Sequence, residues 1–300
     1  MAGRYLCSED EAMRRGFGGV DCARRRQVLR ETIAAFGQSD PPDRYLHLAM
    51  ENLDRWRAQS GDSQPEFNVQ VFPGDWGEVT RALTNTHSVC FAVLNMANAY
   101  VPGGAYVEGA VAQEENMFRR TDCYFRVVDD EYDGRLDRYR LELTSLLSAQ
   151  GGVVYLDAQR PRVCIRGPED RSRADLGYPW LAEDQVFPFF ELRAAARDLR
   201  DGSDFDPQDT RRRVSAQLNT LRHHRLRHVV LGAFGCGAFR NPADRVARIY
   251  RDEIGLRAAD FSVVAFAIFS AGYGPDNYTP FAEAFKRELP LKPGLPTDAR

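Results

Sequence analysis

The sequence predicts an α/β protein in which a mostly parallel or mixed sheet lies between layers of helices. Three apolar runs of strand length carry this prediction, and they lie at residues 87–95, 228–234 and 261–269. Segments with helical spacing separate these runs, and the first two runs lead into glycine-containing stretches. Because a strand that is apolar throughout is buried on both faces, we expect helices on both sides of the sheet.

The order of the other elements follows from the spacing of the apolar residues. In the first expected helix, Val28, Leu29, Ile33 and Phe36 fall on one side. Residues 187–192 fit either a strand or the start of a helix. Further helices and strands are expected in chain order: helices at residues 22–36, 43–57, 207–222, 242–254 and 280–289, and strands at residues 69–72, 153–156 and 163–166.

Turn and capping residues predict where elements begin and end. The polar stretch QSGDSQ at residues 59–64 indicates a loop after the helical N-terminal region. Asn241 is expected to cap a helix that has Pro242 at its first position and stops at Gly255. The expected organisation is a helical N-terminal extension at residues 1–66, an α/β domain at residues 67–289 and a loose, proline-rich tail at residues 290–300.

The composition is typical of a globular protein and argues against a disordered or membrane-spanning chain. Of the 300 residues, 43% are hydrophobic and 28% are charged, which is enough apolar mass for a core. The apolar runs are too short to cross a bilayer, so no membrane association is expected. The first residues, MAGRYLCSEDEAMRRGF, contain no apolar signal core. We therefore expect an intracellular protein, cytoplasmic or, in a eukaryote, nuclear.

Charge and ligand spacing argue against several kinds of site. The formal net charge is −3, so direct binding to duplex nucleic acid is not expected. The six cysteines form no C-x-x-C pair, which favours free thiols in a reducing compartment over disulfides or a zinc site. His223, His224 and His228 cluster without an acidic or cysteine ligand at metal spacing, which indicates a solvated helix end. We therefore expect no metal ion.

The first glycine segment, residues 94–120, follows an expected strand and ends in an expected helix. Its glycines allow the backbone to approach a ligand closely and leave N–H groups free. Two adjacent carboxylates at the helix start are either ordinary partners of the helix dipole or a catalytic pair. The residues that carry this segment's chemistry are Asn98, Gly103, Gly104, Gln113, Glu114 and Glu115.

The second glycine segment, residues 231–242, also joins an expected strand to an expected helix. Gly232, Gly235 and Gly237 have the spacing G-x-x-G-x-G, which matches neither the dinucleotide-binding fingerprint nor a P-loop. A strand, a glycine turn and a helix N-terminus together form a good cradle for a diphosphate. Taken alone, however, a glycine turn of this kind indicates a tight structural turn rather than a ligand site. Cys236 within it is interpreted as a small loop residue rather than a nucleophile, because no histidine is assigned nearby.

Together, the two segments resemble the macrodomain superfamily and, within it, the microbial-type poly(ADP-ribose) glycohydrolases. That family has a glycine triplet followed after a short spacer by Gln-Glu-Glu. Here Gly103-Gly104-Ala105 is followed by seven residues and then by Gln113-Glu114-Glu115. The resemblance covers roughly residues 20–288, with the stretch GAFGCGAF as the diphosphate loop, and alanine in the third glycine position is a departure from the family.

The resemblance implies a macrodomain-like three-layer α/β/α fold with a mixed central sheet and a helical N-terminal extension. It also implies hydrolysis of ribose–ribose O-glycosidic bonds in poly(ADP-ribose) with release of ADP-ribose, without a cofactor or metal. Glu115 is the implied general acid and then base, and Glu114 orients the ribose or holds Glu115. The implied substrate-binding residues are Asn98, Gly103, Gly104, Gln113, Gly235, Cys236, Gly237, Ala238 and Phe239.

Other interpretations of the sequence stay open. Asn277 and Phe281 follow the last expected strand, and they either line the adenine end of the cleft or form an ordinary loop and helix cap. The protein is expected to act on poly(ADP-ribose) and ADP-ribosylated proteins. The alternatives are a macrodomain that binds ADP-ribose without cleaving it, and a hydrolase of mono-ADP-ribosylated protein or nucleic acid. The paired acids favour an enzyme, because a binding module has no need for them.

Overall fold

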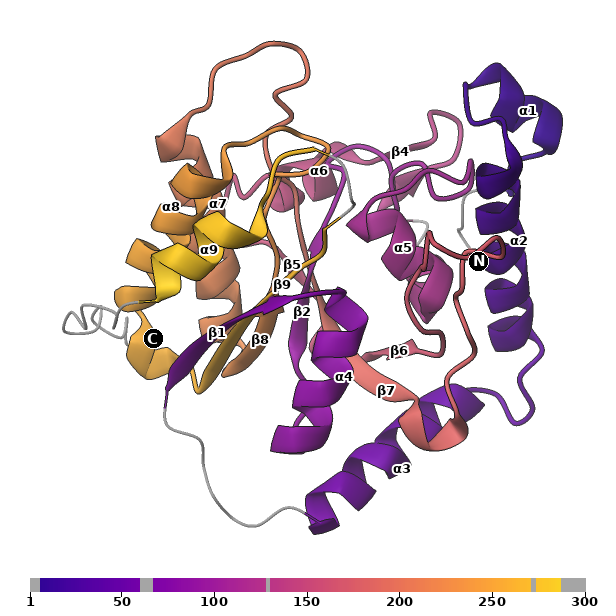
Figure 1. The fold of residues 1–300 in the computed structure, drawn as a ribbon, viewed down its shortest axis with the longest axis horizontal. Helices are drawn as coiled ribbons and strands as arrows, with labels where there is room; N and C mark the ends of the chain where they lie inside the picture. The colour runs from indigo at the N-terminus through magenta and orange to yellow at the C-terminus, as the bar shows by residue number, and fades with distance from the viewer. Residues whose placement is uncertain (1–5, 60–66, 128–129, 271–273, 287–300) are drawn as a thin grey trace.

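The computed structural model describes residues 6–59, 67–127, 130–270 and 274–286. Helices and strands alternate along these residues (Figure 1). The helices are α1 (Glu9–Arg14), α2 (Val20–Gly37), α3 (Arg44–Gln59), α4 (Trp76–His87), α5 (Gln113–Arg120), α6 (Leu141–Leu147), α7 (Pro207–His223), α8 (Ala243–Gly255) and α9 (Tyr278–Phe285), with short 3₁₀ helices η1 (Asp122–Arg126), η2 (Glu183–Gln185) and η3 (Ala258–Asp260). The strands are β1 (Asn68–Pro73), β2 (Ala92–Met96), β3 (Tyr132–Asp133), β4 (Arg138–Tyr139), β5 (Tyr155–Leu156), β6 (Arg162–Cys164), β7 (Phe187–Ala194), β8 (His228–Leu231) and β9 (Val263–Ile268).

The central sheet is mixed, as predicted. Among the described residues it has seven strands, in the order β1-β9-β8-β2-β7-β5, and β6 also pairs with β7. The pairs from β1 through β7 are parallel, whereas β5 and β6 both run antiparallel to β7. The parallel strands β2 and β8 therefore end at the same edge of the sheet, and each of them leads into one of the two glycine segments.

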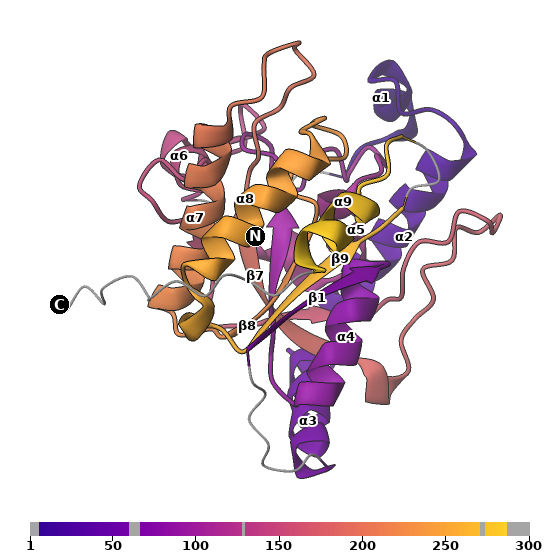
Figure 2. The same cartoon turned by 60° about the vertical axis from the view of Figure 1, so that its left-hand side comes forward.

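Helices cover both faces of the sheet (Figures 1 and 2), which confirms the predicted α/β fold with a mixed central sheet and agrees with the predicted three layers. Alternate residues of β9 show the two faces clearly, because successive side chains of a strand point to opposite sides. Phe266 packs into a core with Leu218 of α7 and Tyr250 of α8. Its neighbour Ala265 belongs to a second core on the other face, which contains Leu83 of α4 and residues of α2, α3 and α5.

The N-terminal helices are part of this second core. Leu29 of α2 and Leu53 of α3 are buried in it together with residues of the sheet. The Thr32 hydroxyl of α2 donates a hydrogen bond of 2.7 Å to the carbonyl oxygen of Arg119, the penultimate residue of α5. The expected division at residues 66 and 67 stays a prediction, since residues 60–66 are outside the described range. The expected tail at residues 290–300 and most of the expected loop at 59–64 are outside it as well.

Several expected boundaries are wrong, and each for a local reason. The apolar run at residues 87–95 is a strand only from Ala92 onwards. His87 instead ends α4, a helix that the spacing did not predict and that Asp75 caps by accepting hydrogen bonds from two backbone N–H groups. β8 ends at Leu231 rather than at residue 234, because the chain enters a turn at residues 234–236, where the N–H of Cys236 donates to the carbonyl oxygen of Ala233 at 3.0 Å.

The expected histidine cluster at a solvated helix end is also only partly correct. His223 is the last residue of α7 and His224 follows it, but His228 begins β8. Its ring lies 5.3 Å from that of Phe91, and burial lowers its pKa to about 4. His228 is therefore a packed residue of the sheet, next to His87 at a ring-centroid distance of 6.1 Å.

Candidate active site

The two glycine segments meet at the carboxyl edge of the sheet, where ligands bind in open α/β sheets. β2 and β8 are paired in parallel, with Ala92 opposite Val229 and Val93 opposite Val230. A Cβ atom placed on Gly232 would lie 3.2 Å from the sulfur atom of Met96, so the segments are in contact where they leave the strands. Residues that are more than 130 positions apart in the sequence are thereby brought together, as the sequence predicted.

Glu114 is a buried carboxyl at the start of α5, with 3% of its surface exposed. Its Oε2 accepts a hydrogen bond of 2.7 Å from the backbone N–H of Asn98, and its Oε1 accepts one of 3.1 Å from that of Gly103. Burial and the neighbouring carboxyl of Glu115 raise its pKa well above the usual range, and the hydrogen bond from Asn98 opposes the shift only partly. Both oxygens of Glu114 are therefore committed to holding the first glycine segment.

Glu115 lies beside it and is also buried, with 9% exposed. Its Oε1 accepts a hydrogen bond of 3.1 Å from the backbone N–H of Ala105. Burial raises the pKa of Glu115, and the carboxylate of Glu108 raises it further, whereas Arg119 one helical turn away lowers it. Two adjacent buried carboxyls resist joint ionisation, so burial and proximity both favour a state in which one of them keeps its proton.

The glycines of the first segment bring its backbone against these carboxyls. Gly104 has a φ of +57°, and a Cβ atom there would overlap Oε1 of Glu115. Gly103 has a φ of +70°, and a Cβ atom there would lie 2.5 Å from the ring of Tyr106. Ala105 is not among the residues with positive φ, and it is half-buried. An alanine is therefore compatible with the backbone at the position where the family has its third glycine.

Gln113 and Asn98 hold this segment in place. The Nε2 group of Gln113 donates to the carbonyl oxygen of Leu94 at 2.8 Å, and its Oε1 accepts from the N–H of Met96 at 3.0 Å. Gln113 thus ties the start of α5 to the end of β2. Oδ1 of Asn98 accepts hydrogen bonds from the backbone N–H groups of Tyr100 at 2.8 Å and Val101 at 3.0 Å.

The second glycine segment presents an open backbone surface. Gly237 and Ala238 are exposed, and a Cβ atom on Gly237 would meet nothing within 4 Å. Gly235 is different, because its φ is +73° and a Cβ atom there would lie 2.5 Å from Cβ of Ala196. Gly235 therefore shapes the turn, and Gly237 leaves space above it.

Asn241 does not cap the following helix, contrary to the expectation. α8 begins at Ala243, and Pro242 occupies the cap position without a side-chain hydrogen bond. The Asn241 amide instead donates to the carbonyl oxygens of Arg197 at 2.8 Å and Gly235 at 3.1 Å. It is buried, and it joins the second glycine segment to the chain that follows β7.

Cys236 is a buried loop residue, with 1% exposed. Its thiol is 3.6 Å from the carbonyl oxygen of Phe234, and burial raises its pKa, so the reactive thiolate is disfavoured. Phe239 is half-buried, and the guanidinium carbon of Arg200 lies 5.3 Å from its ring centroid.

The two residues expected at the adenine end have different positions. Asn277 lines a pocket of about 290 Å³ together with Cys236, Gly237 and Arg240 of the second glycine segment. Phe281 is fully buried and packs against Phe266, with ring centroids 5.2 Å apart. Phe281 is therefore a core residue, and the expectation that it lines the adenine end of the cleft is wrong.

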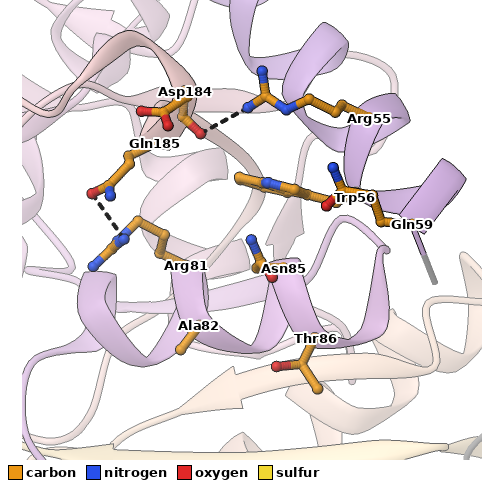
Figure 3. Close-up of a pocket in the computed structure, with 9 residues that line it drawn as sticks. All are labelled: Arg55, Trp56, Gln59, Arg81, Ala82, Asn85, Thr86, Asp184 and Gln185. Carbon is orange, nitrogen blue, oxygen red and sulfur yellow. Dashed lines mark hydrogen bonds between the residues drawn. The ribbon is translucent and has the colours of Figure 1, made fainter.

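A larger pocket, of about 650 Å³, lies away from these residues, between α3, α4 and η2 (Figure 3). It is near the end of α4, on the side of the sheet where β2 begins. None of the predicted site residues contributes to it. Its lining residues are Arg55, Trp56, Gln59, Arg81, Ala82, Asn85, Thr86, Asp184 and Gln185.

A buried ionic cluster, which is not among the predicted site residues, lies beneath the site. Glu191 of β7 is fully buried and accepts hydrogen bonds from Arg193 at 2.7 Å, Arg162 at 2.9 Å and the Asn95 amide at 2.8 Å. Burial alone would raise the pKa of Glu191, but the two guanidinium groups lower it to about 2. The sequence signal was present, since ELR interrupts an otherwise apolar strand, FPFFELRA.

The described part of the chain holds neither a candidate metal-ligand cluster nor a candidate membrane-spanning helix. No group of three or more His, Cys, Asp or Glu side chains there is arranged to hold a metal ion. No helix of that part is long and apolar enough to cross a membrane. All six cysteines lie within it, and each is a free thiol.

Comparisons with known proteins agree with this geometry. Residues 27–145 match the family model of the microbial-type poly(ADP-ribose) glycohydrolase (PARG) catalytic domain. A search among curated proteins found no match.

Among solved structures, the PARG of Thermomonospora curvata is 22% identical with a TM-score of 0.60, over 88% of this chain and 100% of that one. The PARG of Deinococcus radiodurans, solved with ADP-ribose, is 24% identical with a TM-score of 0.51, over 80% of this chain and 92% of that one. The resemblance to the microbial-type PARGs is thus confirmed: the chain has their fold, and its residues 27–145 have the sequence pattern of their catalytic domain.

Proposed function

We propose that this protein is a poly(ADP-ribose) glycohydrolase that cleaves ribose–ribose O-glycosidic bonds and releases ADP-ribose. The observation that carries the proposal is the buried carboxyl pair, Glu114 and Glu115, held against a glycine turn at the carboxyl edge of the sheet. Simple ligand binding does not require such a pair, whereas cleavage of an acetal needs a group that gives and takes a proton.

Glu115 is the proposed general acid and base. It protonates the 2′-oxygen of the leaving adenosine ribose as the C1″–O bond breaks and an oxocarbenium-like centre forms. The carboxylate then takes a proton from the attacking water, so the enzyme returns to its starting state. Burial raises the pKa of Glu115, which favours the protonated form that the first step requires. Glu114 is less suited to this role, because the first glycine segment occupies both of its oxygens.

The second glycine segment is the proposed diphosphate site. Gly235, Cys236, Gly237 and Ala238 offer backbone N–H groups there, and the dipole of α8 favours an anion at its N-terminal end. Asn98 is proposed to bind the terminal ribose and Phe239 to pack on it. Support comes from the solved relatives, since the Deinococcus radiodurans PARG holds ADP-ribose and the Thermomonospora curvata PARG holds the inhibitor ADP-HPD.

The test is to incubate the pure protein with poly(ADP-ribose) and, separately, with mono-ADP-ribosylated protein and nucleic acid, and to quantify the free ADP-ribose released. We expect release from the polymer, in the absence of added metal or cofactor. Release from mono-ADP-ribosylated substrates alone would mean that Glu115 acts on the bond between ADP-ribose and its protein or nucleic acid, and not on the ribose–ribose bond. Binding of ADP-ribose without release from any substrate would make the protein a binding module.

A further inference from the structure

The connection between β7 and α7, residues 195–206, lies against the second glycine segment. The backbone N–H of Leu199 donates to the carbonyl oxygen of Phe239 at 3.1 Å, and the Asn241 amide donates to the carbonyl oxygen of Arg197 at 2.8 Å. These two bonds fix the connection beside the proposed diphosphate site. In Figures 1 and 2, a long loop leads into the start of α7 and extends beyond the sheet.

Arg200 of this connection reaches the aromatic ring of Phe239. Its guanidinium carbon lies 5.3 Å from the centroid of the Phe239 ring. The Asp198 carboxylate holds one edge of the guanidinium, with its Oδ2 at 3.0 Å from Nε and 2.5 Å from Nη2. About half of the Arg200 side chain, 53%, is nevertheless exposed. The guanidinium is thus oriented by two neighbours while part of its surface faces solvent.

The proposed catalytic carboxyl contributes to the electrostatic environment of Arg200. Asp198 is the main cause of the raised pKa of Arg200, and Glu115 raises it as well. Arg200 therefore contacts Phe239 and also interacts electrostatically with the proposed catalytic carboxyl. The Arg200 guanidinium is thus separate from the proposed diphosphate site, which consists of the backbone N–H groups of residues 235–238.

We propose that Arg200 binds a phosphate of the polymer unit beyond the scissile bond, and so makes the site selective for polymer. This proposal rests on the proposed function. The terminal unit places its diphosphate on the second glycine segment and its ribose on Phe239. The next charged group of the polymer is then the diphosphate of the unit that leaves. A guanidinium suits it, because its planar set of N–H donors can contact two phosphate oxygens at once.

The experiment compares ADP-ribose and polymer affinity in the Glu115→Gln background, where polymer is not consumed, with and without Arg200→Gln. We expect ADP-ribose affinity to stay within about twofold, and polymer affinity to fall by about tenfold or more, the size of one charge-assisted hydrogen bond. The salt dependence of polymer binding should also become weaker, because one phosphate contact is lost.

Arg173→Gln is the matched control. Arg173 pairs with Asp175 two residues later along the chain, at 2.9 Å, and its side chain is 59% exposed, much like that of Arg200. No predicted site residue contributes to its electrostatic environment. This variant should therefore leave both affinities unchanged.

Two results would overturn the proposal. An equal loss of ADP-ribose and polymer affinity in Arg200→Gln would mean that Arg200 merely supports Phe239. Unchanged affinity for both would mean that it contacts no part of the substrate. Turnover of polymer by the parent protein, measured separately, tests the proposed function, so the failure of one claim is distinguishable from that of the other.

Discussion

The backbone N–H of Ala105 donates a hydrogen bond of 3.1 Å to Oε1 of Glu115. The residue that departs from the family's glycine triplet is thus the one that holds the proposed catalytic carboxyl. Because this contact uses the backbone and Ala105 is outside the left-handed region, its methyl group is compatible with the contact.

The first prediction concerns the triplet. Ala105→Gly should leave kcat for polymer within about twofold, because it changes no hydrogen bond. Gly104→Ala should be destabilising by about 1–3 kcal/mol, the cost of a side chain in a left-handed conformation. It should also lower kcat, because its Cβ would overlap Oε1 of Glu115. Urea unfolding and polymer turnover measure both effects. Equal behaviour of the two variants would contradict this account of the turn.

The second prediction separates binding from folding in the second glycine segment. Gly237→Val should weaken ADP-ribose binding by at least ~2 kcal/mol, or about 30-fold, because it blocks approach to the backbone. Its melting temperature should be unchanged, since the space above Gly237 is open. Gly235→Ala should instead lower the melting temperature, because Ala196 and Asn241 occupy that space. Calorimetry that shows parental affinity in Gly237→Val would remove this segment from the site.

The third prediction is a pH effect. The Glu108 carboxylate raises the pKa of Glu115, so Glu108→Gln should lower that pKa. Activity declines as Glu115 loses its proton, and the alkaline limb of the kcat profile should therefore move to lower pH. Glu11→Gln is the matched control, because Glu11 and Glu108 both pair with Arg15 but only Glu108 affects Glu115. A shift of equal size in both variants would refute the role of Glu108.

The fourth prediction concerns the ionic cluster beneath the site. Glu191→Gln should be destabilising by about 3–5 kcal/mol at pH 7, because it removes the buried carboxylate that pairs with Arg193 and leaves Arg162 paired with Asp157 alone. The folded pKa of Glu191 is about 2, below its ordinary value of 4.5. Its stabilising effect is therefore complete above pH 4.5 and is lost as pH falls through about 2.

The difference in unfolding free energy between parent and Glu191→Gln should accordingly narrow as the pH is lowered below 4.5. Glu283→Gln, which breaks the exposed pair with Lys286, serves as the control and should change stability by less than about 1 kcal/mol. A difference for Glu191→Gln that is small at pH 7, or that is constant with pH, would speak against this assignment.

Much of the fold could be predicted because its strands are apolar throughout and its helices have regular spacing. β8 and β9 were found in this way, although their ends were not. α4 was missed because its buried residues, such as Thr80 and Thr84, include polar side chains that do not produce an apolar stripe. Asn241 was expected to cap a helix because asparagine is common at that position. An asparagine amide can equally well donate hydrogen bonds to carbonyl oxygens of two loops, as Asn241 does.

The site was accessible from the sequence where a motif linked residue types to a known chemistry, as for Glu114 and Glu115. The sequence could not show which carboxyl is held through both oxygens, because that depends on the turn at Gly103 and Gly104. It also could not show that Arg200 stacks on Phe239, since the two are brought together only by folding. The burial of Phe281 depends in the same way on the packing of α9.

The central claim is that Glu115 transfers the proton, and the direct measurement is polymer turnover by Glu115→Gln. The substitution keeps the size of the side chain and an oxygen that can accept the Ala105 N–H, but it cannot shuttle a proton. We predict a loss of at least about 10²–10⁴ in kcat, the usual contribution of general acid–base catalysis. ADP-ribose affinity should stay within about tenfold of the parent value. Turnover of polymer by Glu115→Gln at the parental rate would contradict the mechanism.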